Sequence, residues 1–196
     1  MKNFRQTWTA VRALLILTIV LGLVYPLVVT GIAQLAFAHN ANGQLTEVDG
    51  EVVGSSIIGQ SFTDADGVAL PEWFQSRPSA TGYDGGASSG SNYGPENADL
   101  IAAIEARQAA IAELEGGPVS EIPVDAVTAS ASGLDPHISP EYALLQVQRV
   151  AEARGISESA VRELVESMIQ GRDLGYLGEP TVNVLLLNIA LAELDG

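Results

Sequence analysis

The sequence contains no cysteine and only two histidines, His39 and His137, among its 196 residues. The missing cysteines exclude disulfide bonds, thiolate metal sites, cysteine nucleophiles and lipid attachment through a thiol. Two histidines are too few for a multi-histidine metal centre within one chain. Lysine is almost as scarce, because Lys2 is the only one. The glycine- and serine-rich stretch at 82–94 therefore lacks the lysine of a phosphate-binding G-x-x-x-x-G-K-[ST] loop. We expect no metal centre and no self-contained nucleotide site.

Positive charge is also scarce. The net charge is −15, from 24 acidic residues against nine lysines and arginines. Lys2, Arg5 and Arg12 precede every acidic residue, and the first acid is Glu47. An acidic surface repels phosphate backbones, so we expect no nucleic-acid partner. It attracts cations, weakly at cellular salt. No stretch has the spacing of a calcium-binding loop.

Charge is absent from residues 13–38. At about 1.5 Å per residue, a helix of this length crosses the ~30 Å hydrocarbon layer of a membrane. Pro26 lies within the stretch and predicts a kink, which membrane helices tolerate. Gly22 and Gly31 offer small surfaces to another helix, although their spacing is not G-x-x-x-G. We therefore name Gly22, Pro26 and Gly31 as candidates for packing within the membrane.

The basic residues before this span predict its orientation. By the positive-inside rule, residues 1–12 form a cytoplasmic tail and 39–196 an extracytoplasmic domain. The alternative is a cleaved secretory signal, because Ala36-Phe37-Ala38 resembles a cleavage site. That would release a soluble extracytoplasmic binding protein starting at His39. The apolar stretch is far longer than the ~7–15 residues of a signal core, so we favour a retained single-pass anchor in the cell membrane.

The remainder predicts a small α+β domain with helices concentrated toward its C-terminal end. Residues 39–54 indicate a polar linker, and 51–62 one or two short strands interrupted at Gly54. Residues 73–97 indicate a long loop, which is functional or disordered at that length. Apolar residues at helical spacing, with Pro95 and Glu96 in the first turn and Gly116 at the end, predict a helix over 95–116.

The C-terminal half predicts one further strand and several helices. The strand covers 121–130. The next helix has Ser139 as its N-cap and Pro140 in its first position, and it continues to 153–155. The following helix covers 155–172, with Ser157 as N-cap and Gly171 as the stop. Residues 180–194 predict a buried helix, although 182–187 would also suit a strand.

Residues 127–143 hold the residue types of a hydrolytic triad. His137 would be the base, Asp135 the group that orients it, and the nucleophile would be Ser130, Ser132 or Ser139. Triad members usually lie far apart in sequence, and Pro136 between the aspartate and the histidine favours an extended or turn geometry. The sequence also has no G-x-S-x-G motif. A secreted or membrane-tethered serine hydrolase is therefore a disfavoured alternative.

Several longer motifs, in a fixed order over nearly the whole chain, resemble the C-subunit family of Kdp-type potassium-transporting ATPases. They are YPLVVTG at 25–31, GSSIIGQSF at 54–62, WFQSRPSA at 73–80, GGASSGSNYGP at 85–95, VTASASGLDPHISPEYALLQVQRVAEARG at 127–155 and NVLLLNIAL at 183–191. Their number and order make this resemblance far more specific than any single motif. The insertion-like TDADGVALPE before Trp73 does not change it.

The resemblance implies a hetero-oligomeric pump in a lipid membrane. Its other parts would be a channel-like potassium-translocating subunit, a P-type ATPase subunit and a small single-helix subunit. This chain would be a non-catalytic accessory subunit, consistent with its lack of a D-K-T-G-T phosphorylation motif. The resemblance implies that the ATPase subunit binds ATP, that this chain binds no nucleotide or other cofactor by itself, and that potassium is the transported ion. The family is also described as a catalytic chaperone that raises the ATP affinity of the ATPase subunit.

We predict that the loops at 73–97 and 127–139 dock on the partner subunits. Aromatic residues are enriched at such interfaces, although Trp73 and Phe74 suit a hydrophobic core equally well. The acidic domain would also raise the local potassium concentration at the entrance of the translocating subunit. The candidate docking residues are Trp73, Phe74, Gln75, Arg77, Tyr83, Ser91, Asn92, Tyr93, Asp135 and His137.

Overall fold

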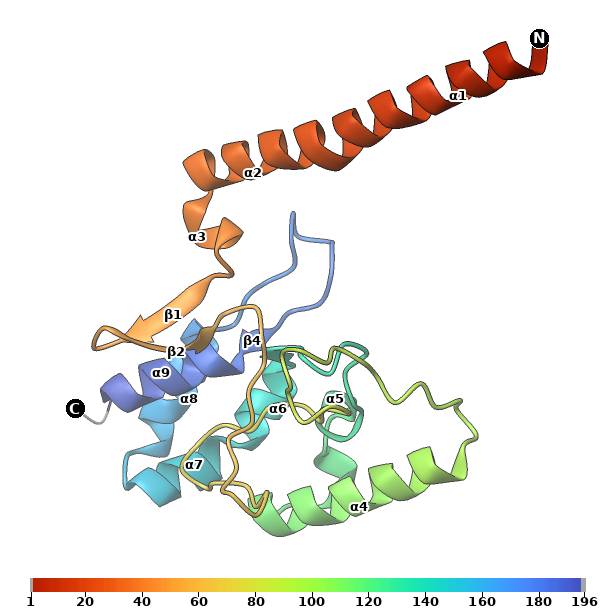
Figure 1. Cartoon of the computed structure of the whole chain (residues 1–196). Helices are drawn as coiled ribbons and strands as arrows, with labels where there is room; N and C mark the ends of the chain where they lie inside the picture. The colour runs from red at the N-terminus through yellow and green to blue at the C-terminus, as the bar shows by residue number, and fades with distance from the viewer. Residues whose placement is uncertain (1, 195–196) are drawn as a thin grey trace. The chain divides into compact units, whose positions relative to one another are not determined.

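The structure is a computed structural model that describes residues 2–194, and its contacts divide the chain into two units, Met1–Leu45 and Thr46–Gly196. Consecutive helical segments make up most of the first unit (Figure 1). They are α1 (Lys2–Ile19), the π-helical turn η1 (Val20–Val24), α2 (Tyr25–Ala36) and the short α3 (Ala38–Ala41). Together, Phe4–Ala36 form a 33-residue helix whose most apolar window has a mean hydropathy of 2.5 and no buried residue. It is a candidate membrane span.

The π-helical turn shows how this helix accommodates Pro26. Proline has no backbone N–H and collides with the carbonyl four residues earlier in a regular helix. Here the Tyr25 N–H bonds to the Val20 oxygen, five residues back, and the helix continues beyond Pro26. A Cβ on Gly22 would lie 4.0 Å from Thr18 and one on Gly31 would meet nothing within 4 Å, so both glycines leave open backbone surface.

A β-hairpin replaces most of the predicted polar linker. Strands β1 (Leu45–Val48) and β2 (Glu51–Ser55) form a two-stranded sheet. Asp49 and Gly50 between them have φ of +53° and +83°, as a type I′ turn requires. The prediction of a linker to residue 54 was therefore wrong, and the Asp-Gly pair was the signal for the hairpin. Strand β2 also runs through Gly54 without a break.

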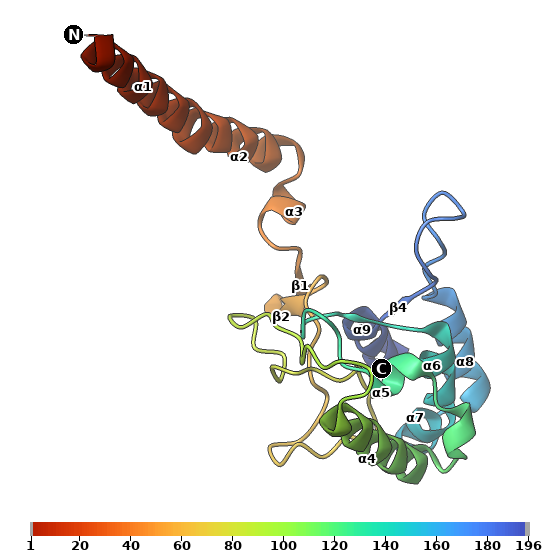
Figure 2. The same ribbon diagram turned by 90° about the vertical axis from the view of Figure 1, so that its right-hand side faces the viewer.

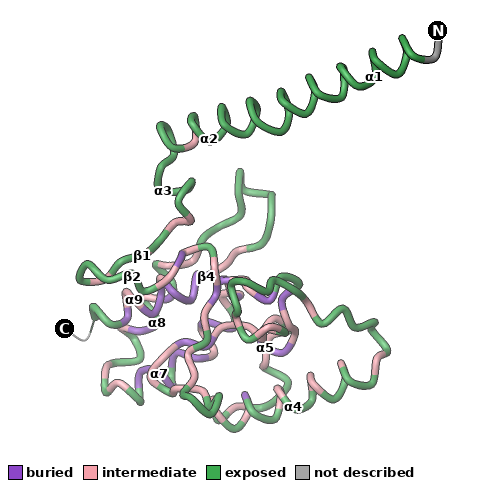
Figure 3. Tube along the Cα trace, viewed as in Figure 1, coloured by how far each residue is buried: buried purple, intermediate pink, exposed green. Residues whose placement is uncertain are grey.

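Short helices around one hydrophobic core build the second unit (Figures 1 and 3). Helix α8 packs against α6, α7 and α9, and its Val161 and Val165 are completely buried. The helices are α4 (Ala98–Glu115), α5 (Val124–Val127), α6 (Pro140–Leu145), α7 (Val147–Arg154), α8 (Glu158–Ser167) and α9 (Val184–Leu194), with a 3-10 turn at η2 (Val119–Glu121). The mixed fold class expected from the sequence is confirmed.

A second small sheet ties the middle of the chain to its C-terminal part. Strand β3 (His137–Ile138) pairs antiparallel with β4 (Val182–Asn183), with His137 opposite Asn183. The sequence 180–194 thus contributes both a strand and the helix α9. Strand β3 places His137 at the edge of the loop that was predicted to dock.

The helix caps follow the sequence closely. The Ser139 hydroxyl accepts from the Tyr142 N–H at 3.1 Å, and the Ser157 hydroxyl accepts from the Ala160 N–H at 3.3 Å, as predicted. Gly116 and Gly155 end α4 and α7 in the left-handed conformation. Asn97 caps α4, so the predicted first-turn residues at 95–96 precede the helix.

Other boundaries differ from the predictions. The predicted strand at 121–130 is wrong, because 124–127 form α5. The helix predicted from 140 to 155 is interrupted at Gln146. The helix predicted over 155–172 ends at Ser167, and residues 168–181 form a loop that projects between α8 and β4 (Figure 2).

Candidate partner-docking site

The two loops predicted to dock lie against each other in the structure. The Ser130 N–H donates to the Pro78 oxygen at 3.1 Å, and the Ser89 N–H donates to the Ser132 oxygen at 2.9 Å. The Ser79 hydroxyl adds a bond to the Gly133 oxygen at 2.7 Å. We call residues 76–93 and 128–139 together the loop platform. Segments about fifty residues apart thus form one surface without a regular sheet.

Close backbone approach makes glycine necessary in the loop platform. Gly133 has φ +69°, and a Cβ there would lie 2.7 Å from the Ser89 oxygen and 2.6 Å from the Thr81 hydroxyl. A side chain would therefore push the two loops apart. Gly90 is similarly confined, because a Cβ there would lie 2.8 Å from the Ala131 oxygen, so glycine is required where the two loops touch.

An ion pair crosses the base of the loop platform. Arg77 Nη1 lies 2.9 Å from Asp135 Oδ2, and the two side chains are 23% and 30% exposed. Asp135 Oδ1 accepts from the His137 backbone N–H at 3.0 Å, and His137 Nδ1 lies 3.5 Å from the same oxygen. Burial alone would raise the pKa of Asp135, but hydrogen bonds from His137 and the Arg77 cation together lower it below its ordinary value. Asp135 thus acts as a charged clamp between the two loops.

Tyr83 fixes the first loop from inside. Its hydroxyl donates to the Arg77 backbone oxygen, and its backbone takes a φ of +63°. Burial raises the pKa of Tyr83 to about 12, partly offset by a hydrogen bond with Ser76. The ring therefore supports the loop platform as a neutral, partly buried group.

Phe74 and Gln75 anchor the start of this loop in the core. Phe74 is fully buried, and its backbone N–H and oxygen bond to the Asn188 side-chain amide at 2.9 and 3.0 Å. Gln75 is 8% exposed, and its side-chain amide donates to the backbone oxygens of residues 62 and 70. Both side chains are enclosed by this chain, so they position the loop and are not available for direct contact.

Trp73 is half-buried beside them. Its ring lies 6.3 Å from that of Phe62, and the Arg154 guanidinium stands 4.2 Å above its centroid. This cation–π contact and a hydrogen bond from Arg154 Nε to the Glu72 oxygen at 2.7 Å hold the segment on α7. The Trp73 ring therefore makes its main contacts within this chain, with Phe62 and Arg154.

The candidates with exposed surface gather toward the tip of the first loop. Tyr93 is 46% exposed, and Ser91 and Asn92 are exposed beside it. Ser91 and Tyr93 line a cleft of about 440 Å³ between the loop platform and α4. Arg107 of α4 also lines the cleft and donates to the Val127 oxygen at 2.9 Å. The cleft therefore combines an aromatic ring, hydroxyls and a cation.

The serine-rich stretch does not assemble a hydrolytic triad. The Ser139 hydroxyl donates to Asp125 at 2.8 Å while it caps α6. Asp135 uses Oδ2 for the ion pair with Arg77, which leaves Oδ1 facing His137. Among residues 2–194, no serine hydroxyl makes a hydrogen bond to His137. Asp135 does approach His137, with Oδ1 3.5 Å from Nδ1, but no serine among residues 2–194 completes the triad that the hydrolase alternative needs.

A buried polar cluster was missed by the sequence analysis. Arg149 of α7 is 8% exposed and lies 3.0 Å from Glu115 at the end of α4. Its guanidinium also donates to the Trp73 oxygen at 3.0 Å and to Gln146 Oε1 at 2.8 Å. Gln146 and Arg149 occupy helix positions i and i+3 beside buried valines, and this polar pair on an apolar face was the available signal.

The structure defines a class of protein: a small mixed α/β domain, with a platform of interlocked loops, that follows one candidate membrane-spanning helix. The family model described as KdpC, the c chain of the K⁺-transporting ATPase, matches residues 7–193. The chain therefore belongs to the KdpC family.

Individual relatives agree over nearly the full length. A protein of Kineococcus radiotolerans named potassium-transporting ATPase KdpC subunit is 53% identical over 95% of this chain and 93% of its own length. Proteins with the same name from Methylococcus capsulatus and Mycobacterium bovis are each 50% identical. They cover 94% and 97% of this chain, and 96% and 99% of their own lengths.

Proposed function

We propose that this chain is the accessory C subunit of an ATP-driven, high-affinity potassium uptake pump in the cell membrane. Its partners are a channel-like potassium-translocating subunit, a P-type ATPase subunit and a small single-helix subunit. Relatives that are about 50% identical over almost their whole lengths and are named potassium-transporting ATPase KdpC subunit support this assignment. The chain itself carries out no catalytic step.

The proposed topology is a single pass. Residues 1–12 form the cytoplasmic tail, 13–38 the transmembrane helix and 39–196 the extracytoplasmic domain. The exposed apolar surface of Phe4–Ala36 supports insertion into lipid or packing against another helix. Three basic residues before the span and none between it and Glu47 support the orientation. Gly22, Pro26 and Gly31 would then face neighbouring helices.

The loop platform carries the docking proposal. Two segments distant in sequence are held together by backbone hydrogen bonds, a glycine contact and the Arg77–Asp135 ion pair. A surface fixed in this way loses little conformational entropy when a partner binds. Tyr93, Ser91 and Asn92 would make direct contacts, while Asp135, His137 and Tyr83 keep the surface in shape.

Two effects on transport follow from this arrangement. The acidic outer domain would raise the potassium concentration at the entrance of the translocating subunit. The chaperone role implied by the family would require an allosteric effect on ATP affinity, because only the short tail faces the cytoplasm in this topology. Coupling would pass through the membrane helix and the partner subunits to a two-state element.

Affinity purification of the tagged full-length chain from its own membranes in mild detergent tests the assignment. We expect a P-type ATPase and a channel-like membrane protein to co-purify, with residues 1–38 still attached to this chain. A lone soluble chain beginning at His39 would contradict both the anchor and the assembly. The electrostatic effect is tested by measuring the potassium affinity of complexes in which surface acids are replaced by neutral residues, at low and at high salt. If the affinity changes at neither ionic strength, the electrostatic proposal is wrong.

A further inference from the structure

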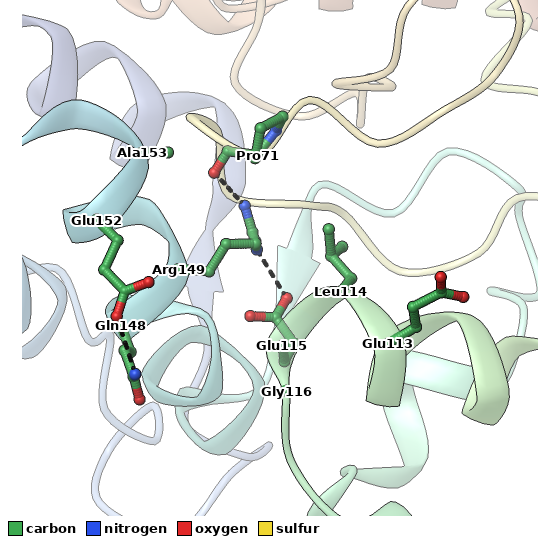
Figure 4. A pocket seen from close by; sticks show the side chains of 9 residues that line it. All are labelled: Pro71, Glu113, Leu114, Glu115, Gly116, Gln148, Arg149, Glu152 and Ala153. Atoms are coloured by element: carbon green, nitrogen blue, oxygen red, sulfur yellow. Dashed lines mark hydrogen bonds and ion pairs between the residues drawn. The ribbon is translucent and has the colours of Figure 1, made fainter.

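A polar cleft of about 510 Å³ lies between the C-terminal end of α4 and helix α7, apart from the loop platform. Figure 4 shows the side chains that line it. Carboxylates come from both helices, Glu113 and Glu115 from α4 and Glu152 from α7. Aliphatic groups of Pro71, Leu114 and Ala153 lie among them.

Glu115 is the innermost carboxylate, and one of its oxygens has no partner. Its side chain is 2% exposed, and Oε1 lies 3.0 Å from Arg149 Nε. The other oxygen, Oε2, is buried and has no hydrogen-bond partner among the described residues. In Figure 4 this oxygen points toward α7. A buried carboxylate oxygen without a donor is rare in folded proteins and indicates a missing partner.

The charges around this oxygen do not balance. Glu113 and Glu152 are exposed on the rim, and neither takes part in an ion pair within residues 2–194. Glu152 only accepts a bond from Gln148 at 3.0 Å. The single cation, Arg149, is directed inward to Glu115, Gln146 and backbone oxygens. The end of α4 adds the negative pole of an 18-residue helix.

From this arrangement we propose that the cleft binds an alkylammonium group, the ε-ammonium of a lysine on a partner subunit. An ammonium carries its donors on one small nitrogen, which suits the single free oxygen of Glu115 together with one carboxylate of the rim. A guanidinium fork suits a carboxylate with both oxygens free, which Glu115 does not offer. The described residues contain no group of three or more acidic or histidine side chains placed to hold a metal ion.

The lining also matches the rest of a lysine side chain. Lysine buries its four-carbon stem along apolar surface while its charged end seeks polar partners. The aliphatic groups in the cleft provide such a surface beside the carboxylates. Lys2 is the only lysine in this chain, and in the proposed topology it lies on the cytoplasmic side. The ammonium therefore comes from another molecule.

Zero-length crosslinking of the purified complex tests this inference, which rests on the proposed function for its partner. A carbodiimide joins a carboxylate to an amine only when the two are in contact, so mass spectrometry should identify a partner lysine linked to Glu113 or Glu152. The double variant E113Q/E152Q should lose this product at least tenfold. The control E163Q/E166Q, which changes two exposed glutamates of α8, should keep it. A complex that co-purifies intact but forms no link at these two glutamates would overturn the inference and leave the proposed function standing.

A second experiment needs only this chain. Nuclear magnetic resonance of the full-length protein in micelles, titrated with the amide of Nα-acetyl-lysine, should shift the Gly116 backbone and Gln148 side-chain signals. The uncharged norleucine analogue should not shift them. Equal shifts with both compounds, or none with either, would overturn the inference. A shift in E113Q/E152Q equal to that of the unchanged protein would also overturn it.

Discussion

The side chain of Gln146 holds the backbone of Gln75 as a neighbouring strand would. Its Oε1 accepts from the Gln75 N–H at 2.6 Å, and its Nε2 donates to the Gln75 oxygen at 3.2 Å. Gln146 is fully buried at the break between α6 and α7. Asn188 of α9 does the same for Phe74. Two buried amides thus fix consecutive residues at the start of the loop that leads to the docking surface.

Replacing Gln146 with leucine should destabilise the domain by at least about 3 kcal/mol. The Gln75 N–H, the Gln75 oxygen and one Arg149 donor would each lose a buried partner, at about 1–3 kcal/mol for an unsatisfied group. Urea unfolding of the full-length protein in micelles, followed by tryptophan fluorescence, measures the change.

Gln148→Leu is the matched control, because Gln148 is exposed on the same helix. It should change the free energy of unfolding by less than about 0.5 kcal/mol. Equal effects of the two substitutions would contradict the role assigned to Gln146.

The sequence predicted what depends on local chemistry. Serine before proline or glutamate identified the caps of α6 and α8, and glycine identified the ends of α4 and α7, because these groups act on neighbouring backbone atoms. The break at Gln146 was not predicted, because it depends on a partner 71 residues away. The predicted strand at 121–130 failed for a similar reason: β-branched residues favour a strand only where another strand is available.

Gly59→Ala should disturb the loop platform. Gly59 is buried, and a Cβ there would lie 2.5 Å from the Asp135 backbone oxygen and 2.8 Å from the Tyr83 ring. Overpacking against backbone costs about 1–3 kcal/mol. We expect that loss in urea unfolding, together with weaker retention of partner subunits during purification.

Gly85→Ala is the control within the same region, because a Cβ at Gly85 would meet nothing within 4 Å. It should leave stability and partner retention close to those of the unchanged protein. Unaltered partner retention in Gly59→Ala would argue against the loop platform as the docking surface.

The Arg77–Asp135 ion pair should make the stability of the fold depend on pH in the acidic range. The pKa of Asp135 is lower in the folded than in the unfolded chain, where it is about 3.9. The clamp therefore stabilises the fold above pH ~4, and this contribution is lost as the pH falls through the folded value. Asp135→Asn should cost about 1 kcal/mol at pH 7, because the ion pair is partly exposed, and should make the decline of stability below pH 4 shallower. Unfolding free energies that fall equally steeply in both proteins below pH 4 would contradict this.

The candidate docking residues divide by a property that the sequence could not show. Aromatic and polar residues at 73–77 and 91–93 look alike in composition, yet Phe74 is fully buried and Tyr93 is 46% exposed. The difference arises because the side-chain amides of Gln146, between α6 and α7, and of Asn188, in α9, bind the backbone at 74–75 in the core. The Glu115–Arg149 pair was also hidden, because its members lie 34 residues apart and meet only through the packing of α4 on α7.

The absence of cysteine allows a direct test of the proposed topology. A cysteine introduced at Gln6 or Ala109, both exposed, would be the only thiol in the protein. In intact cells, a membrane-impermeant maleimide should label A109C but not Q6C, because the positive-inside rule places the tail in the cytoplasm. After permeabilisation, both should be labelled. Recovery of labelled Q6C on a full-length chain would also show that the span is retained, since cleavage at Ala38 would remove residue 6. Labelling of Q6C alone in intact cells would reverse the proposed orientation, and with it the placement of the acidic domain at the outer entrance of the pump.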